Sequence, residues 1–249
     1  MISIGFDGAL IALVWSIAPI CGTFVQLWFG ALSDRYQRRG VGRRAFLIGG
    51  GVATSISLVG FSMSRTQVEW LAQYFDRPLS DPTVRAYIKV NCIIWFCLVN
   101  VAIQPLQMAS RAIIIENNDK SDQVVASAWA SRMQGVGSIL GFMLGSISLS
   151  EVLPLGLATN FTILCILGSV FLLATTLISA SVIREEFDSV DPFLYTAEAN
   201  GIGDRSRAFI EGIATMPREL WQVFTIQFFA WLGWFPFRTY YTRYAFHVI

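Results

Sequence analysis

The most informative stretch of this chain reads Gly30-Ala-Leu-Ser-Asp34-Arg35-Tyr-Gln-Arg38-Arg39-Gly-Val-Gly42-Arg43-Arg44. It contains the end of an uncharged run, residues 8–33, and the arginine cluster that follows that run. About 20 apolar residues of helix cross the hydrocarbon core of a bilayer, so this uncharged run is long enough to span a membrane. Loops rich in Lys and Arg stay on the cytoplasmic side. The stretch therefore predicts a membrane-spanning helix with its arginine-rich end in the cytoplasm.

The composition of the whole chain agrees with that interpretation. Hydrophobic residues make up 54% of the 249 residues and charged residues 14%, whereas about 25% of the residues of an ordinary soluble domain are charged. The formal net charge of +1 gives no electrostatic reason to expect a nucleic-acid partner. The four cysteines lie inside apolar runs without the spacing of metal ligands. We interpret them as small buried or lipid-facing residues and predict no cofactor.

Uncharged runs recur along the chain, and each predicts one helix. The fourth helix is expected to begin near Val124 and to carry Arg132, and the fifth to span about Ala158 to Val182. Length and repetition, rather than periodicity, distinguish these runs from the buried helices of a soluble protein. The sequence thus predicts an all-α polytopic membrane protein with about six spans. The uncharged runs are residues 8–33, 45–64, 90–110, 133–150, 152–183 and 220–237.

The loops between the runs differ in their basic residues, which sets the orientation in the membrane. Eleven Lys and Arg residues fall on one side and four on the other. This bias places residues 34–44 and 184–219 in the cytoplasm and residues 65–85 outside. The N-terminus then lies outside, so we expect that a preceding helix is missing.

The longest polar stretch, residues 184–219, predicts a cytoplasmic linker between two parts of the chain. We expect residues 1–183 to form an N-terminal transmembrane bundle that lacks its first helix. Residues 220–249 would then be the truncated first helix of a C-terminal bundle. In the outer loop over residues 65–89 we expect a short interfacial helix around Trp70.

Polar side chains inside membrane spans are costly, so they usually face a cavity or a partner. Asn100, Gln104, Gln107 and Arg111 follow one another at spacings of 4, 3 and 4 residues. Those spacings place the four side chains on one helical face. Two interpretations of this stripe stay open: hydrogen bonding to a neighbouring helix, or the lining of a path for a polar substrate.

The fourth predicted helix has one charge and several glycines. Its charge, Arg132, follows Trp129 by one turn, and the side chain either reaches to the membrane interface or pairs with an acid or a ligand. The glycines at positions 135, 137, 141 and 145 predict close packing against another helix. With a single histidine and no nucleophile or phosphate-loop motif, the chain is not expected to be an enzyme.

Four motifs, in order along the chain, resemble those of one group of carriers. The loop from Gly30 to Arg44 resembles the signature loop between the second and third helices of the major facilitator superfamily. The later motifs are similar to those of the fungal sucrose and α-glucoside:proton symporters, in the glycoside–pentoside–hexuronide:cation symporter family. They are SRAIIIE at 110–116, AWASRMQGVG at 128–137 and QFFAWLGWFPF at 227–237.

This resemblance implies a helical bundle of the major-facilitator type with twelve helices, of which the chain corresponds to the second to the seventh. It also implies transport of sucrose or another α-glucoside together with a proton, within a lipid bilayer. The plasma membrane is the expected location, with the vacuolar membrane as the alternative. A second hypothesis is a non-transporting membrane protein, either a degenerate copy of a carrier or a sensor.

The resemblance also assigns roles to individual residues. Arg111 matches the sugar-binding arginine of the related plant carriers, whose aspartate eleven positions earlier is replaced here by Asn100. Asp34 matches the acid that holds the inward gate closed. Glu116, which with Arg132 is one of the two other charges expected within the membrane spans, stands where the family usually has an aspartate. The expected sugar-binding residues are Arg111, Asn100, Gln104, Gln107, Trp15 and Trp231. The expected gating loop comprises Gly30, Asp34, Arg35, Gly42, Arg43 and Arg44.

Overall fold

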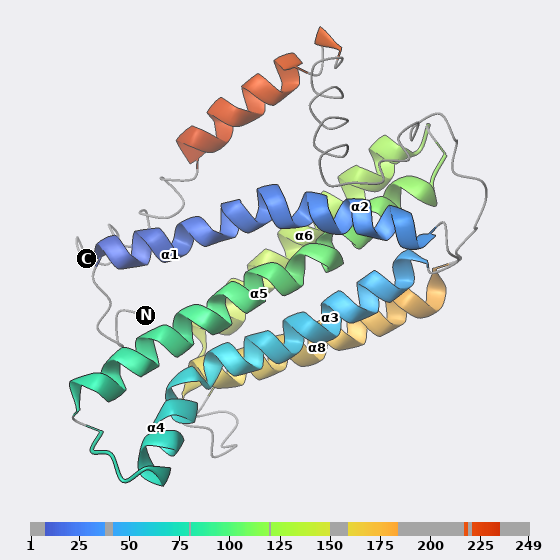
Figure 1. Cartoon of the computed structure of the whole chain (residues 1–249). Coiled ribbons are helices and arrows are strands. Elements are labelled where there is room, and N and C mark those ends of the chain that lie inside the picture. Colours follow the sequence, from blue (N-terminus) through green and yellow to red (C-terminus); the bar gives the residue numbers. More distant parts are fainter. Residues whose placement is uncertain are drawn as a thin grey trace. The chain divides into compact units, whose positions relative to one another are not determined.

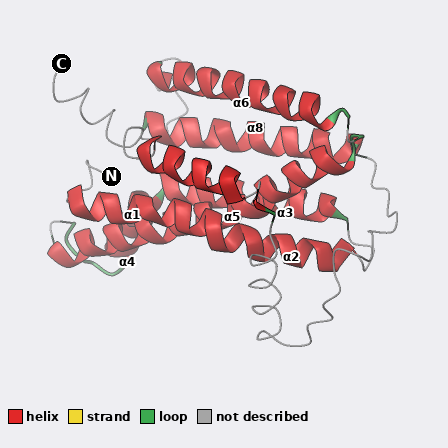
Figure 2. Ribbon diagram, turned by 90° about the horizontal axis from the view of Figure 1, so that it is seen from above, coloured by secondary structure: helices red, strands yellow, loops and turns green. Residues whose placement is uncertain are grey.

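A computed structural model describes residues 8–37, 42–79, 81–119, 121–149, 159–183, 217–218 and 221–234. Every regular element in these ranges is a helix (Figure 2), which confirms the all-α prediction. The chain divides into two compact units, residues Met1–Asp188 and Ser189–Ile249. The second unit contributes one described helix over residues 221–234, whose side chains are exposed. Of the predicted linker over 184–219, all but residues 217 and 218 lie outside the described residues.

The first uncharged run forms a continuous helical span in three parts. These are α1 (Gly8–Ile20), a π-helical turn η2 (Cys21–Val25) and α2 (Gln26–Gln37), and residues Leu13–Gly30 meet the length and composition of a membrane span. Pro19 has no N–H to donate within the helix. The π-helical turn begins two residues after this proline, and within the turn the Thr23 hydroxyl donates to the Pro19 carbonyl over 2.9 Å.

Three further helices are long and apolar enough to cross a membrane: α3 (Arg43–Ser62), α5 (Pro82–Glu116) and α8 (Asn160–Val182). The start of α6 (Gln123–Ser146) and the bounds of α8 agree with the sequence-based expectation. The described residues contain four candidate spans, and α6 and the helix over 221–234 are not among them. A count of six spans therefore stays a prediction.

Helix α3 is the centre of the first unit, since it packs along both α5 and α8 (Figure 1). Two of its glycines allow the close approach of α5. A Cβ added at Gly50 would lie 2.7 Å from the backbone nitrogen of Leu106, and one at Gly60 would lie 2.5 Å from the Trp95 ring. Small residues let helix backbones approach in a membrane, where lipid supplies no hydrophobic drive for association. These glycines therefore fix the distance between α3 and α5.

The contact between α3 and α8 combines small residues with buried hydroxyl groups. The Ser55 hydroxyl donates to the Ser169 carbonyl over 3.4 Å. The Ser169 hydroxyl donates to the Cys165 carbonyl of its own helix over 2.8 Å and lies 3.3 Å from the Ser55 carbonyl. A Cβ at Gly51 would lie 2.9 Å from the Thr176 hydroxyl oxygen. Both serines are almost fully buried. The two helices are thus joined by reciprocal polar contacts in the middle of their spans.

The predicted packing face of the fourth helix is not observed. No described residue lies within 4 Å of a Cβ placed at any of the α6 glycines, Gly135, Gly137, Gly141 and Gly145. No residue of α6 is buried within the described part of the chain. The predicted glycine-mediated contact is therefore not observed among the described residues, whose close helix contacts are made by the glycines of α3.

The short helix expected around Trp70 is present as α4 (Ser64–Tyr74), directly after α3. Its buried side, Val68 and Ala72, packs against Val84 and Ile88 at the start of α5. Helix α5 itself begins with Asp81, whose carboxylate accepts the Thr83 backbone N–H over 2.9 Å, and with proline at the first helical position. Both are favoured signals at a helix N-terminus.

Candidate functional site

The polar stripe predicted for the third span lies on α5, in the half of the helix that ends at Glu116. Gln104 is buried, at 5% exposure, and Asn100 is half-buried, whereas Gln107 and Arg111 are exposed. The stripe therefore runs along the edge of the packed helices, with one side covered and the other open. Such an edge can offer polar groups to a ligand or to a helix that packs against it.

The amide groups of this stripe already make hydrogen bonds within α5. The Asn100 side-chain N–H donates to the Phe96 carbonyl over 2.8 Å, and that of Gln104 donates to the Asn100 carbonyl over 2.9 Å. Each bond joins residues one helical turn apart. Of the two open interpretations, hydrogen bonding to a neighbouring helix has no support from these two residues.

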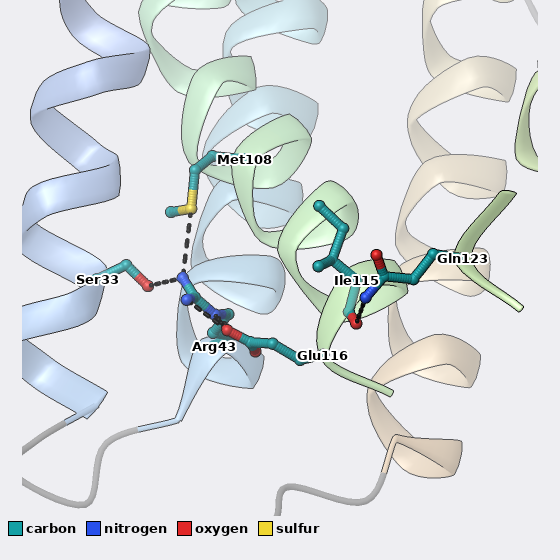
Figure 3. A network of polar contacts seen from close by, with 6 residues as sticks. All are labelled: Ser33, Arg43, Met108, Ile115, Glu116 and Gln123. Carbon is teal, nitrogen blue, oxygen red and sulfur yellow. Dashed lines mark hydrogen bonds and ion pairs between the residues drawn. The ribbon is translucent and has the colours of Figure 1, made fainter. Parts of the chain in front are cut away.

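A polar network joins three helices at the end of the bundle where α3 begins (Figure 3). Arg43 Nε lies 2.7 and 2.8 Å from the two carboxylate oxygens of Glu116, and Arg43 Nη2 lies 2.5 Å from Oε1. Arg43 Nη1 donates to the Ser33 hydroxyl of α2 over 3.3 Å and contacts the Met108 sulfur at 3.8 Å. Paired contacts of this kind between guanidinium and carboxylate are the strongest form of salt bridge.

Neither charge of this pair stabilises the helix that carries it. Arg43 is the first residue of α3 and Glu116 the last of α5. A cation at a helix N-terminus and an anion at a C-terminus both oppose the helix dipole. The favourable electrostatic energy of both side chains comes from their contact with each other. The placement of Arg43 and Glu116 therefore indicates a role in joining α3 to α5.

The next arginine makes the corresponding contact on the other side of α3. Arg44 Nε donates to the backbone carbonyl of Ala180, in the last turn of α8. A cation at the C-terminal carbonyls of a helix is favourable. Arg43 and Arg44, which we call the arginine fork, thus hold the start of α3 to the ends of α5 and α8.

Sequence reasoning placed both arginines in the gating loop and Glu116 among the intramembrane charges, but it did not pair them. The sequence holds only part of the signal: an acid closes one span and two arginines open another, and the basic-residue count puts both ends on the same side of the membrane. Gly42 precedes α3 in an extended conformation, and a Cβ at Gly30 would meet nothing within 4 Å. The side chains of Asp34 and Arg35 lie outside the described residues.

The remaining candidate residues are not brought together with the stripe. Arg132 lies over the ring of Trp129, with its guanidinium carbon 5.1 Å from the ring centroid, on the exposed surface of α6. This is a cation–π contact within one helix. Trp15 on α1 is 45% exposed. Trp231 belongs to the second unit, so its position relative to α5 is not defined.

Helices long and apolar enough to span a membrane, joined at one end by the arginine fork, are features of an integral membrane protein. The comparisons bear on this class directly. Over 246 residues, or 98% of this chain, the sequence is 28% identical to the general alpha-glucoside permease of Schizosaccharomyces pombe. It is 26% identical over 249 residues to the sucrose transport protein SUC4 of Arabidopsis thaliana, and 27% identical over 255 residues to SUT2 of Oryza sativa subsp. indica.

These comparisons confirm the resemblance that the sequence motifs indicated, to fungal α-glucoside carriers and plant sucrose carriers. The chain spans about half the length of the curated relatives it matches, between 43% and 48%. A comparison with models of protein families finds no match.

Proposed function

We propose that this chain provides one half of a sugar carrier that moves a disaccharide or other α-glucoside across a membrane together with a proton. The observation that carries the proposal is similarity to named permeases and sucrose transport proteins over 94–98% of the chain. The activity belongs to an assembly of about twice this length, in which the substrate site lies between two halves near the middle of the membrane. Residues 1–183 would be the N-terminal half, and residues 184–219 would lead into the second.

In this proposal the open edge of α5 faces the sugar. Gln107 and Arg111 are exposed and Asn100 is half-buried, so their polar atoms are available to hydroxyl groups once a second half closes over them. Trp15 and Trp231 would supply flat apolar faces for the sugar ring. Arg132 and Glu116, the other charges expected within the spans, are assigned no contact with the sugar. Asn100 can bond a hydroxyl but takes up no proton, so the coupled proton would need another acceptor.

The arginine fork, together with Gly30, Asp34, Arg35 and Gly42 of the loop, would act at the cytoplasmic end. The Arg43–Glu116 contact ties α2, α3 and α5 into one piece at that end. A carrier that alternates between two openings needs each half to move as a unit, and such a contact supports that. The protein would then be a non-enzymatic carrier of the major facilitator type, in the plasma or vacuolar membrane.

The second candidate is a non-transporting membrane protein, such as a degenerate copy of a carrier or a sensor. The two candidates differ in what a supplied second half does.

The deciding experiment measures uptake of labelled sucrose or maltose in cells that lack their own carriers. We expect no uptake from this chain alone, and uptake above background, abolished by a protonophore, when the C-terminal half of the Schizosaccharomyces pombe permease is co-expressed. A pair that reaches the membrane in normal amount without uptake would favour the non-transporting candidate.

Arg111 gives the matched test of the sugar site in that complemented pair. Arg111→Lys keeps the charge but loses the planar group that can bond two hydroxyls at once, so uptake should be nearly abolished. Gln107→Ala, one turn away, should weaken uptake less, because a neutral hydrogen bond contributes about 0.5–1.5 kcal/mol net. Wild-type uptake by the Lys variant would mean that Arg111 only anchors the helix at the interface.

A further inference from the structure

Helix α4 carries a cluster of exposed aromatic rings that the proposed transport activity does not use. Trp70 is 65% exposed, Tyr74 73% and Phe75 67%. The rings of Trp70 and Tyr74 are stacked at 6.1 Å between centroids, and Phe75 meets Tyr74 edge-on at 5.3 Å. An exposed apolar patch of this kind usually marks a surface that another phase or molecule covers.

The surface of α4 is divided into three flanks by its sequence. Ser64, Val68 and Ala72 repeat every four residues on the buried flank. Arg65, Glu69 and Gln73 repeat in the same way on a second flank, where Arg65 and Glu69 form an ion pair at 2.7 Å. The aromatic flank, Trp70 and Tyr74, lies on the other side of the buried one. The exposed part of α4 is therefore itself amphipathic.

A polar clamp fixes which way these flanks face. Gln67 of α4 accepts the Asn91 side-chain N–H over 3.0 Å and the Trp95 indole N–H over 2.8 Å, both from α5. The Asn91 amide also donates to the Ser64 carbonyl over 2.9 Å. With the apolar contact to Val84 and Ile88, this clamp prevents α4 from rolling on α5. The aromatic flank is thus held outward rather than exposed by chance.

The position of α4 along the chain decides what covers that flank. Helix α3 ends at Ser62 and α5 begins at Pro82, and both are long and apolar enough to span a membrane. Helix α4 joins these two ends, at the opposite end of α3 from its first residue, Arg43 (Figure 1), which is where a membrane surface would lie. Its 11 residues amount to about 16 Å of helix, too short to cross. Trp and Tyr side chains concentrate at the headgroup level of a bilayer, because one part of the ring system is apolar and another polar.

We propose that α4 is a lipid-binding interfacial helix, with Trp70, Tyr74 and Phe75 embedded among the lipid headgroups and the Arg65–Glu69–Gln73 flank in water. Because Gln67 is hydrogen-bonded to Asn91 and Trp95 of α5, the depth of α4 in the membrane surface then fixes the depth of α5 in the bilayer. This assignment needs the membrane insertion of the chain but not its transport activity.

The test places a spin label at Tyr74→Cys or, as the matched control on the neighbouring flank, at Gln73→Cys. Both variants are made in the full chain with its four natural cysteines replaced, and reconstituted in phosphatidylcholine vesicles. Collision rates with oxygen, which concentrates in lipid, and with a water-soluble nickel chelate are compared. We expect the oxygen-to-nickel ratio to be several-fold higher at position 74 than at position 73.

Equal, water-like ratios at both positions would overturn the proposal, and so would spin–spin broadening at position 74, which would mean that a second copy covers the flank. A second measurement needs no cysteine replacement, so it tests the proposal even where the spin-labelled variants fail to fold. Brominated lipid should quench less of the total tryptophan fluorescence in Trp70→Phe than in the unaltered chain. Unchanged quenching would also contradict lipid contact.

Discussion

At the residue scale the Arg43–Glu116 pair is where the structure adds most to the sequence. The guanidinium is mostly covered, at 13% exposure of the side chain, whereas the carboxylate is 40% exposed. Solvent therefore screens part of the attraction, and exposed pairs contribute about 0.2–1 kcal/mol. The two-oxygen contact and the additional Ser33 bond place this pair near the upper end of that range.

We expect Arg43→Gln and Glu116→Gln each to lower the melting temperature of the purified chain in detergent. The double variant should lose no more than the worse single variant, because both substitutions break the same contact. Arg65→Gln, which breaks the exposed Arg65–Glu69 pair within α4, is the control and should change the melting temperature little. Additive losses in the double variant would show that the two side chains do not act through each other.

The partner of Arg43 could not be predicted from the sequence, although both residues were singled out. Glu116 lies 73 residues further along the chain. The basic-residue count indicates that the two helix ends share one side of the membrane. Any of the five arginines in the loop is, by sequence alone, an equal candidate to pair with the Glu116 carboxylate. Only the packing of α3 against α5, fixed by glycines in mid-span, brings Arg43 rather than its neighbours to Glu116.

At the scale of elements, we expect a change of glycine to alanine to have opposite effects on stability in α3 and in α6. Gly50→Ala should lower stability, because the new Cβ would lie 2.7 Å from the Leu106 backbone and a backbone atom cannot turn aside. Overpacking of this kind costs about 1–3 kcal/mol. Gly141→Ala on α6 meets none of the described residues within 4 Å and should be neutral or slightly stabilising.

Both variants are expressed side by side and solubilised in detergent. Their stability is compared by their resistance to an added protease. Greater sensitivity of Gly50→Ala alone is the expected result. If Gly141→Ala were the sensitive variant, the α6 glycines would pack against a helix after all, as their spacing suggests.

The helices themselves could largely be predicted, because length and lack of charge suffice for a membrane span. The bounds of α8, the start of α6 and the short α4 all follow from local sequence. Which glycines pack could not be predicted, since Gly50 and Gly135 look alike until the neighbouring helix is known. The candidate sugar residues on α5 share an edge as their spacing predicts, but Gln104 is buried and Gln107 exposed, a difference set by the helices packed beside them.

At the scale of the molecule, orientation in the membrane is the prediction that can be checked first. Helix α3 is long and apolar enough to cross a membrane once, so we expect the residues before and after it on opposite surfaces. Given the basic-residue bias, Gly40→Cys should react with a membrane-impermeant maleimide only after cells are opened, and Arg77→Cys in intact cells. The unaltered chain, in which Cys21, Cys92 and Cys165 are buried, is the background control. Reaction of position 40 from outside would reverse the orientation.

The arginine fork also sets an order of events during synthesis. Its two partners lie 73 and 136 residues after it. At about 5–20 residues per second, the ribosome supplies Glu116 roughly 4–15 s after Arg43, and Ala180 roughly 7–27 s after Arg44. Until then the first turn of α3 holds two cations at the positive end of its dipole with neither partner made. A nascent chain that is released after α6 but before α8 contains Glu116, the partner of Arg43, but lacks Ala180, the partner of Arg44. The unfinished chain therefore differs from the complete bundle at Arg44, and cellular quality control has a charged group by which to recognise it.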